Sequence, residues 1–200
     1  MEEINKSLRT AMIKRRVYPI VEKIDWKIID DMRREMHLMV IDDPDKDIYL
    51  LLDSEGGESG AALAGYDFFK AIPAKVTAVI NGFCKSSCLE LIAGCTKRLA
   101  TKNSVFFFHS AKVHMEITTS IVDEIDNFIA ERMKQYQLYV DAYYDAYLQG
   151  FGLEKNRVRE LERIGDAVHR SYTAHEAKEL GVIHEIIDQF PFYEFKSPHS

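Results

Sequence analysis

Two polar residues separated by a short stretch of chain have the types and placement needed for nucleophilic catalysis. Ser86 lies where a short apolar run gives way to a helical apolar pattern, and His109 directly follows the apolar run Val105–Phe108. A serine hydroxyl is a weak nucleophile at neutral pH, so it needs a base within hydrogen-bonding reach. A histidine at a strand end is a suitable base, and the free amides of a helix start can stabilise an oxyanion. The pair therefore indicates acyl-transfer chemistry.

The elements around Ser86 would have to hold its hydroxyl rigidly. The β-branched run Val76–Ile80 predicts a strand that turns sharply at Asn81-Gly82, and the apolar residues after Ser86 predict a helix. A serine at such a strand-to-helix turn is held with its hydroxyl exposed. Taken alone, the same stretch also fits a buried helix with an ordinary N-cap serine and a structural histidine.

A second strand–turn–helix unit precedes the first and favours a reactive site. The apolar run Ile48–Leu52 predicts a buried strand, which leads into Ser54-Glu55-Gly56-Gly57 before a helical pattern begins. Paired glycines can take positive φ, approach a ligand closely and leave amide N–H groups where an oxyanion could be held. Gly-Gly alone would predict only a tight turn. Two such units in series, followed by a strand-end histidine, are far more specific.

Four segments of the chain together resemble the ClpP family of self-compartmentalising serine peptidases. DSEGGESGAALAGYDFF is similar to the family's SPGG segment and following helix, and GFCKSSC is similar to its G-x-A-x-S-x-G nucleophile motif, with Ser86 four residues after Gly82. KNSVFFFH resembles the segment that ends in the family's histidine, and TAHEAKELGVIHEI resembles its SAxEAxxxGLxD segment. The resemblance runs from about Arg16 to Ile187, with its segments in the family's order.

The resemblance implies a chemical role for each of these positions. Ser86 is then the nucleophile and His109 its base, while the amides of Gly57 and Ser87 form the oxyanion hole. Ser87 is also a possible nucleophile, but the spacing from Gly82 favours Ser86. No cofactor and no metal are expected. The implied activity is hydrolysis of peptide bonds in unfolded polypeptides inside a ring-shaped chamber.

The resemblance also implies the fold and the assembly. The expected fold is α/β, a ClpP/crotonase-like spiral of ββα units, with a flexible tail over 1–15, one peptidase domain over 16–190 and a C-terminal tail over 191–200. A long amphipathic, tyrosine-bearing pattern covers about 118–148. Such a helix could pack on its own domain, whereas in the family a handle helix interlocks two heptameric rings. The expected partners are other copies of the chain and an AAA+ unfoldase, with polypeptides as substrates.

The third catalytic position departs from the family's pattern. Counting back from Thr173, His169 stands where the family has an aspartate. A second imidazole cannot hold His109 in the required tautomer as a carboxylate does. Asp166 is the nearest carboxylate upstream and is the predicted replacement, with Glu162 a poorer candidate one helical turn further away. A weaker serine–histidine dyad and a loss of peptidase activity stay open as alternatives.

Further departures flank the nucleophile and the glycine turn. Lys85 and Cys88 replace small residues, and Glu55 replaces the SPGG proline. A lysine adjacent in sequence has a poor approach to the Ser86 hydroxyl, which argues against a serine–lysine dyad. Glu55 could repel acidic peptides, bind basic ones or simply be solvated. Cys84 and Cys88 have a spacing that zinc can use, but no second pair of ligands is evident, so buried apolar packing is the better account.

Composition and charge restrict the class of protein. The chain has 200 residues, a formal net charge of −6 and 3 cysteines. Lysine and arginine neither dominate nor cluster, which argues against nucleic-acid binding. No apolar run reaches membrane-spanning length, the N-terminus lacks the apolar core of a secretory signal, and the odd cysteine count fits a reducing compartment. We therefore expect a cytoplasmic protein without membrane association.

Two competing functions stand beside a ClpP-like serine endopeptidase. The first is a catalytically weak or silent ClpP-like scaffold subunit. The second is a crotonase-type acyl-CoA enzyme, since that superfamily shares the spiral fold and a two-amide oxyanion site. The pair of Ser86 and His109 argues against the second function, because crotonase chemistry usually relies on carboxylates near the bound thioester. A serine-reactive probe separates all three.

Overall fold

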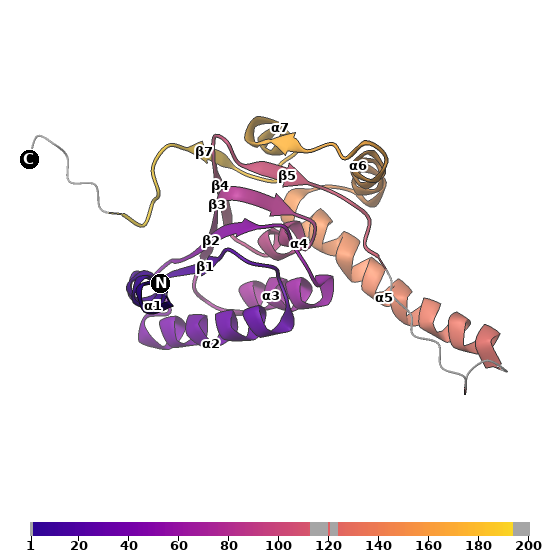
Figure 1. The fold of residues 1–200 in the computed structure, drawn as a ribbon, viewed down its shortest axis with the longest axis horizontal. Helices are drawn as coiled ribbons and strands as arrows, with labels where there is room; N and C mark the ends of the chain where they lie inside the picture. Colours follow the sequence, from indigo (N-terminus) through magenta and orange to yellow (C-terminus); the bar gives the residue numbers. More distant parts are fainter. Residues whose placement is uncertain (1, 113–119, 121–123, 194–200) are drawn as a thin grey trace, which may run out of the picture.

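The computed structural model describes residues 2–112, 120 and 124–193. In this part of the chain strands and helices alternate along much of the sequence (Figure 1). The strands are β1 (Val17–Ile20), β2 (Ile48–Ser54), β3 (Val76–Lys85), β4 (Lys97–Thr101), β5 (Val105–Phe107), β6 (Tyr172–Thr173) and β7 (Glu185–Ile187). The helices are α1 (Glu2–Lys14), α2 (Trp26–Asp42), α3 (Ser59–Ala71), α4 (Ser87–Ala93), α5 (Ile125–Phe151), α6 (Lys155–Val168) and α7 (Ala174–Glu179).

Most of the strands form one parallel sheet through the middle of the molecule. Its order is β1-β2-β3-β4-β7, and β5 pairs with β3 in parallel and with β6 in antiparallel orientation. In Figure 1 helices α2 and α3 lie on one side of the sheet, and α6 and α7 lie near β5 on the other. Parallel neighbours need helical crossovers that cover the sheet, which explains the apolar runs of β2 and β3. This arrangement confirms the predicted α/β class.

Helix α2 shows how the sequence pattern determines the packing. The Asp25 carboxylate caps the helix by accepting a hydrogen bond from the Ile28 amide at 2.8 Å. Apolar residues recur here at helical spacing, and most of this stripe is buried in the core: Ile29, Met32, Met36 and Met39. Trp26, the first residue of the helix, belongs to the same stripe but is 50% exposed.

Strand β3 corrects one expectation from the sequence. The predicted turn at Asn81-Gly82 does not end the strand, which continues to Lys85. Gly82 has a φ of +136°, and a Cβ at this position would lie 2.3 Å from Asp53 Oδ1, so only glycine fits the bend. Before the bend the strand pairs with β4, and after it the strand pairs with β5. The bend therefore lets one strand change neighbours just before the predicted nucleophile.

Helix α5 has 27 residues and different surroundings at its two ends. In its C-terminal part four side chains are buried: Tyr143, Ala146, Tyr147 and Phe151. The N-terminal part projects away from the sheet in Figure 1. Large apolar side chains exposed on this part include Ile129, Met133 and Leu138. The predicted helix starts near Thr118, which lies outside the described residues. Exposed apolar side chains on a projecting helix are typical of a surface that contacts another subunit.

The described residues near the two ends of the chain contact the sheet. The sequence predicts a flexible segment over 1–15, but most of this segment forms helix α1. Arg9 donates a hydrogen bond to the hydroxyl of the buried Tyr18 at 2.5 Å, and its guanidinium lies over the same ring. At the other end, the ring of Phe192 packs edge-on against Tyr49 with centroids 5.5 Å apart. These contacts join both ends of the described chain to β1 and β2.

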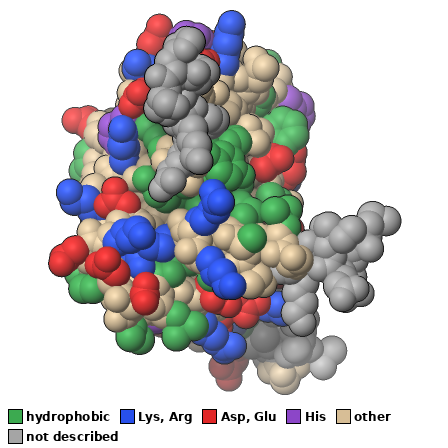
Figure 2. All heavy atoms as spheres, turned by 90° about the vertical axis from the view of Figure 1, so that its left-hand side faces the viewer, with side chains coloured by type: hydrophobic (Ala, Val, Ile, Leu, Met, Phe, Trp, Pro, Cys, Tyr) green, Lys and Arg blue, Asp and Glu red, His purple; other side chains and the backbone are tan. Residues whose placement is uncertain are grey.

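The face at the left-hand side of Figure 1 carries mixed charge. Figure 2 shows that lysine and arginine side chains alternate there with aspartate and glutamate side chains, and that hydrophobic side chains are exposed between them. The described residues form no continuous basic surface on this face of the kind that binds a phosphate backbone. None of the described helices is long and apolar enough to cross a lipid bilayer.

Candidate active site

Ser86 occupies a strained backbone position between β3 and α4. Its φ is +53° and its ψ is −128°, a conformation that residues with a side chain rarely adopt. The Ser86 amide donates a hydrogen bond to the Phe107 carbonyl at 2.9 Å, so the pairing of β3 with β5 holds the strained residue in place. The Ser86 hydroxyl makes no capping hydrogen bond to α4. It is therefore held at a strand-to-helix turn and available for chemistry.

The neighbouring serine has a different environment. Ser87 is fully buried, and its hydroxyl has no hydrogen-bond partner among the described residues. Ser86 is only partly buried and lines a cavity. A substrate in the cavity could reach the Ser86 hydroxyl, whereas access to Ser87 would require displacement of α4. This difference favours Ser86 over Ser87 as the nucleophile.

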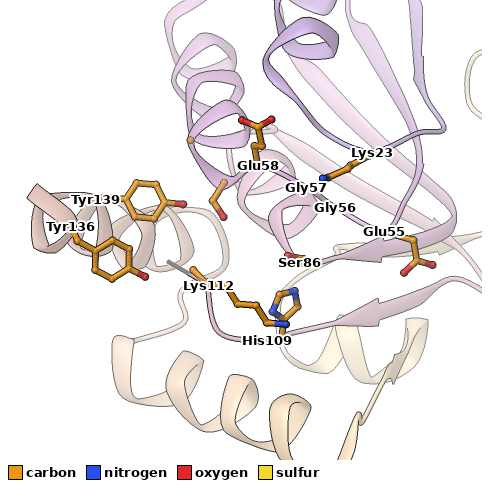
Figure 3. A pocket seen from close by; sticks show the side chains of 13 residues that line it. Lys23, Glu55, Gly56, Gly57, Glu58, Ser86, His109, Lys112, Tyr136 and Tyr139 are labelled. Atoms are coloured by element: carbon orange, nitrogen blue, oxygen red, sulfur yellow. The ribbon is translucent and has the colours of Figure 1, made fainter. Parts of the chain in front are cut away.

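His109 faces the same cavity from the end of β5 (Figure 3). The last residues of β3 pair with β5, with Lys85 opposite Phe107, and this pairing brings Ser86 and His109 to one edge of the sheet. Nδ1 of His109 lies 2.9 Å from the Ser110 carbonyl oxygen. Because a carbonyl only accepts, this contact assigns the proton to Nδ1 and leaves Nε2 as the acceptor. No hydrogen bond between described atoms joins the imidazole to Ser86.

Asp166 contacts Ser110, the residue whose carbonyl oxygen lies against the His109 imidazole. Its Oδ2 accepts a hydrogen bond from the Ser110 amide at 3.3 Å, so the carboxylate holds the main chain that in turn contacts His109. Within the described residues no hydrogen bond joins Asp166 to His109 directly. His169 is the C-cap of α6, with a φ of +51° and an exposed side chain. The structure therefore brings Asp166 into the same region as Ser86 and His109, but through an intermediate residue.

Gly56 and Gly57 place the turn between β2 and α3 against the nucleophile. Gly56 has a φ of +93°, and a Cβ there would lie 2.5 Å from the Lys85 carbonyl oxygen and 2.8 Å from Ser86 Cβ. Only glycine allows this close approach. The Gly57 and Ser87 amides are the predicted oxyanion donors, and neither donates a hydrogen bond to another described residue. Both N–H groups are therefore unused by the described part of the protein.

Gly57, Ser86 and His109 line one cavity of about 680 Å³, whereas Ser87 and Asp166 are not among its lining residues (Figure 3). Several lining residues were not identified from the sequence, among them Lys23, Glu58, Ser59, Lys112, Tyr136 and Tyr139. The two tyrosines come from α5, whose tyrosine pattern pointed to a subunit interface rather than to the site. Their amphipathic character was the available signal, but only tertiary packing brings α5 to the cavity. The hydroxyls of both tyrosines point into the cavity in Figure 3.

Glu55, which replaces the family's proline, forms an ion pair with Lys85. The Lys85 ammonium lies 2.9 Å from both carboxylate oxygens of Glu55, and it also lies 3.8 Å from the centroid of the Phe83 ring. These contacts engage the lysine away from the serine hydroxyl, which agrees with the argument against a serine–lysine dyad. They also balance the charge of Glu55, so this carboxylate should have only a weak electrostatic effect on substrate selection.

Two buried carboxyl groups lie near the cavity. Glu90 on α4 is 2% exposed and Glu162 on α6 is 4% exposed. Ser59 donates a hydrogen bond to Glu90 Oε1 at 2.8 Å, and the hydroxyls of Tyr143 and Tyr144 donate to Glu162. Burial raises the pKa of Glu90 to about 8. Burial also raises the pKa of Glu162, although its tyrosine hydrogen bonds oppose the shift. Shifted carboxyl groups beside a cavity are typical of functional sites.

The cysteines have a structural role. All three are free and buried: Cys84, Cys88 and Cys95. Burial raises the pKa of the Cys84 thiol well above its usual value and that of Cys95 to about 12, so both remain protonated. This burial confirms the predicted role as small apolar residues. The described part of the chain contains no cluster of three or more residues that could hold a metal ion.

Comparisons with known proteins identify the family of the chain. The family model described as Clp protease matches residues 1–190. The ATP-dependent Clp protease proteolytic subunit 1 of Chlamydia pneumoniae is 30% identical over 191 residues, which cover 94% of this chain and 92% of the relative. The subunit 1 of Chlamydia abortus is 29% identical over 91% of each chain. The proteolytic subunit 3 of Rhodococcus jostii is 25% identical over 92% of this chain and 86% of its own length.

A strained serine at a strand-to-helix turn and a histidine on the same cavity are the arrangement expected of a serine hydrolase. The full-length matches to proteolytic subunits narrow that class to a serine endopeptidase. The chain belongs to the Clp protease family. This finding confirms the predicted family and its α/β ClpP fold, and it sets aside the crotonase-type alternative.

Proposed function

We propose that Ser86 is the nucleophile, His109 the general base, and the Gly57 and Ser87 amides the oxyanion hole of this endopeptidase. The observation that carries the proposal is the strained backbone of Ser86, with a φ of +53°, at a turn that opens onto the cavity. Backbone strain persists only where the surrounding structure enforces it, and it is concentrated at reactive residues. The pairing of β3 with β5 supplies that enforcement.

The proposed reaction follows from the protonation of His109. Its unprotonated Nε2 takes the proton of Ser86 Oγ as Oγ bonds to the scissile carbonyl carbon. The carbonyl oxygen becomes an oxyanion, which the Gly57 and Ser87 N–H groups stabilise. The tetrahedral intermediate collapses, the amine leaves with the proton from His109, and the acyl group stays on Ser86. Water, deprotonated by His109, then releases the second product. Catalytic hydrogen bonds absent from the free protein can form when substrate binds.

For the third catalytic position we propose Asp166 as a positioning residue that acts through the main chain at Ser110. The hydrogen bond of 3.3 Å from the Ser110 amide supports this role. A carboxylate at this place also favours the imidazolium that forms during the reaction. Glu162 is the alternative, since it interacts electrostatically with His109, but two tyrosine hydroxyls already occupy its oxygens.

The assembly is also a proposal. We infer a homo-oligomeric ring, either a heptamer or a double ring, formed by a peptidase domain over 16–190 in which α5 acts as the handle. The exposed apolar side chains on the projecting part of α5 support this inference. The proposed substrates are unfolded polypeptides, the proposed partner is an AAA+ unfoldase, and the proposed location is the cytoplasm. The names of the relatives, which are ATP-dependent proteolytic subunits, support the partner.

A catalytically silent scaffold subunit is the second candidate. Two observations favour it: His169 takes the place of the family's aspartate, and no described hydrogen bond joins His109 to Ser86. The two candidates predict opposite results with a reagent that reacts only with activated serines.

A fluorophosphonate decides between these candidates. The active enzyme should be labelled at Ser86, and Ser86→Ala should abolish both labelling and peptide cleavage. Labelling that persists in Ser86→Ala and vanishes in Ser87→Ala would assign the other serine. An assembled oligomer that does not react at all would support the scaffold, and a mass measurement of the intact assembly supplies the stoichiometry.

A further inference from the structure

A second cavity, of about 460 Å³, lies at the edge of the sheet where three adjacent parallel strands begin. Lys75 precedes β3, Arg98 is the second residue of β4, and His184 precedes β7. Ser86 follows the opposite end of β3, so this cavity is separate from the candidate active site. Its volume lies in the range of pockets that hold small molecules.

The charged side chains that line this second cavity are basic. Its polar lining includes two lysines, an arginine and a histidine, and no described aspartate or glutamate: Lys70, Lys75, Arg98 and His184. Neither lysine forms an ion pair within the described part of the chain. Glu185 follows His184 in sequence, but it pairs with Lys97 at 3.2 Å. The cavity therefore has positive charge that no described carboxylate balances.

Three helix ends at this edge of the sheet balance only part of that charge. Residues from the last turns of α3, α4 and α5 line the cavity. The C-terminus of a helix carries a partial charge of about −0.5, so three such ends offset about 1.5 positive charges. Lys70, Lys75 and Arg98 together supply more than this. A surplus of positive charge is left for a ligand.

Arg98 is a buried cation whose described hydrogen-bond partners are uncharged. The residue is 5% exposed. Its guanidinium donates hydrogen bonds to the carbonyl oxygens of Val182 at 2.8 Å, Cys95 at 3.1 Å and Gly181 at 3.4 Å. A guanidinium has five N–H donors, so one on Nη1 and one on Nη2 do not meet a carbonyl. Burial lowers the pKa of this group, as expected for a cation removed from water.

His184 makes two contacts with Arg98 that cannot both be hydrogen bonds. Its Nδ1 lies 3.0 Å from the Arg98 backbone nitrogen, and its Nε2 lies 3.2 Å from Nη2. Both arginine atoms are donors, whereas a neutral imidazole has one acceptor nitrogen. In either tautomer one N–H therefore faces another N–H. Because His184 is exposed, its ring can turn and allow an acceptor oxygen to lie between the two donors.

We propose that this second cavity binds a phosphate group, held by Arg98, His184 and the two lysines. A phosphate monoester carries a charge of about −1.5 to −2 near neutral pH and three strong acceptor oxygens. It therefore matches the surplus charge and the unused N–H groups better than a carboxylate, which has a single charge and two oxygens. A phosphate ion fills only part of about 460 Å³, so a small phosphorylated molecule is the expected source of the group. The inference does not depend on the role proposed for Ser86.

Calorimetric titration of the full-length protein at constant ionic strength tests the proposal. Adenosine 5′-monophosphate should bind with a Kd of about 1 mM or lower, and inorganic phosphate should bind as well. Tighter binding of the nucleotide would identify an esterified phosphate as the ligand, and equal affinities would identify free phosphate. Adenosine and acetate are the controls. If neither phosphate compound binds, or if adenosine or acetate binds as tightly, the proposal is wrong.

Two substitutions test whether binding occurs at this cavity. Asparagine in His184→Asn can accept the hydrogen bond from the Arg98 amide in place of Nδ1, but it has no donor at the place of Nε2. This variant should raise the Kd of inorganic phosphate about tenfold, because a hydrogen bond to a charged group is lost. Lys75→Gln removes an exposed charge and should raise the Kd about two- to fivefold.

Lys102→Gln is the matched control for Lys75→Gln. Lys102 is equally an exposed lysine, but it does not line this cavity. Its substitution changes the net charge by the same amount and should change the Kd by less than about twofold. If Lys102→Gln weakens binding as much as Lys75→Gln does, general attraction by surface charge explains the binding and the proposal is wrong.

Urea unfolding without ligand shows whether each variant folds. If His184→Asn does not fold, Lys75→Gln decides: an unchanged Kd overturns the proposal and a raised Kd supports it. Failure of this proposal is distinct from failure of the proposed function. Fluorophosphonate labelling of Ser86 reports on the peptidase alone, and phosphate binding reports on the second cavity alone.

Discussion

The parts of the site that come from strands and from helices are held in different ways. Ser86 and His109 come from the ends of β3 and β5, and main-chain hydrogen bonds such as the 2.9 Å bond from Ser86 to Phe107 fix this region. Glu90 and Glu162 come from α4 and α6 with buried carboxyl groups, and Glu90 Oε2 has no hydrogen-bond partner among the described residues. Paired backbone groups hold a geometry, whereas unpaired buried groups respond to protons and ligands. The strand ends thus fix the positions of Ser86 and His109, whereas the helices carry the buried groups whose protonation can change.

A Gly56→Ala substitution should have the largest effect on the region of Ser86 and His109 at the strand ends. The new Cβ would lie 2.5 Å from the Lys85 carbonyl oxygen and 2.8 Å from Ser86 Cβ, at a φ of +93°. The backbone must move, and small displacements of reacting groups are expensive, so kcat/KM for a peptide should fall at least about 100-fold. Steady-state cleavage and fluorophosphonate labelling rates measure this loss.

Gly152→Ala is the control that separates the steric clash expected at position 56 from the strain of an alanine at positive φ. Gly152 has a φ of +72°, but a Cβ there would meet nothing within 4 Å. This variant should lose about 1–2 kcal/mol of stability and keep its labelling rate at Ser86. An equal loss of labelling in both glycine variants would show that global stability, rather than contact with the nucleophile, controls the site.

An Asp166→Asn substitution tests whether a helix-borne carboxylate supports the strand-borne pair. Asparagine can still accept the hydrogen bond from the Ser110 amide, which measures 3.3 Å in the wild type, but it carries no charge. We expect kcat to fall about 10- to 100-fold with little change in KM, because the imidazolium of His109 loses its stabilising charge. His169→Ala should keep most of the activity. If Asp166→Asn is harmless and Asp166→Ala is not, the residue holds only the main chain.

The helix-borne part should make stability depend on pH. Burial raises the pKa of Glu90 from 4.5 to about 8, so the folded state holds this proton more tightly than the unfolded state does. The free energy of unfolding should therefore fall as the pH rises from about 4.5 to about 8, with a slope of up to about 1.4 kcal/mol per pH unit from this group. Glu162, whose pKa is also raised, adds a slope of the same sign.

Urea unfolding of wild type and Glu90→Gln across this pH range measures the contribution. The variant should have a shallower slope, and its stability relative to the wild type should rise with pH, because glutamine does not ionise. Identical slopes in both proteins would contradict the assignment of the titration to Glu90.

Loss of the Glu55–Lys85 ion pair should have the smallest effect. Glu55 is 67% exposed, so solvent screens its pair with Lys85. Glu55→Gln should change the free energy of unfolding by less than about 1 kcal/mol, and added salt should reduce the difference further. A larger effect in urea unfolding at physiological salt would show that the glycine turn depends on this pair.

The positions of Ser86 and His109 in the fold could be predicted because each residue lies at the end of an element with a local sequence signal. Ser86 follows a strand and precedes a helix, and His109 follows a short apolar run, so periodicity indicates that both lie at the ends of elements. Their predicted chemical role needed the second strand–turn–helix unit and the family resemblance. The glycine turn has an equally local signal. The family resemblance then supplied the order of the elements, which the described strands follow.

The remaining parts of the site depend on contacts that sequence patterns do not encode. The bend at Gly82 was predicted as a strand end, because Asn-Gly is a strong turn signal and the change of neighbouring strand is a tertiary event. Glu90 lies in an apolar helix, where nothing in the sequence indicates that it meets Ser59 from another helix. The contact of Asp166 with Ser110 depends on the docking of α6, which spacing alone cannot determine.

The change of neighbours along β3 has a consequence for how a newly made chain folds. The end of β3 pairs with β5 only after the chain has completed α4 and β4. Such non-local parallel pairing forms slowly compared with helices. Until the Ser86 amide meets the Phe107 carbonyl, nothing enforces the strained backbone of the serine. We therefore expect cleavage competence to arise among the last events of folding, which protects immature subunits from cutting one another.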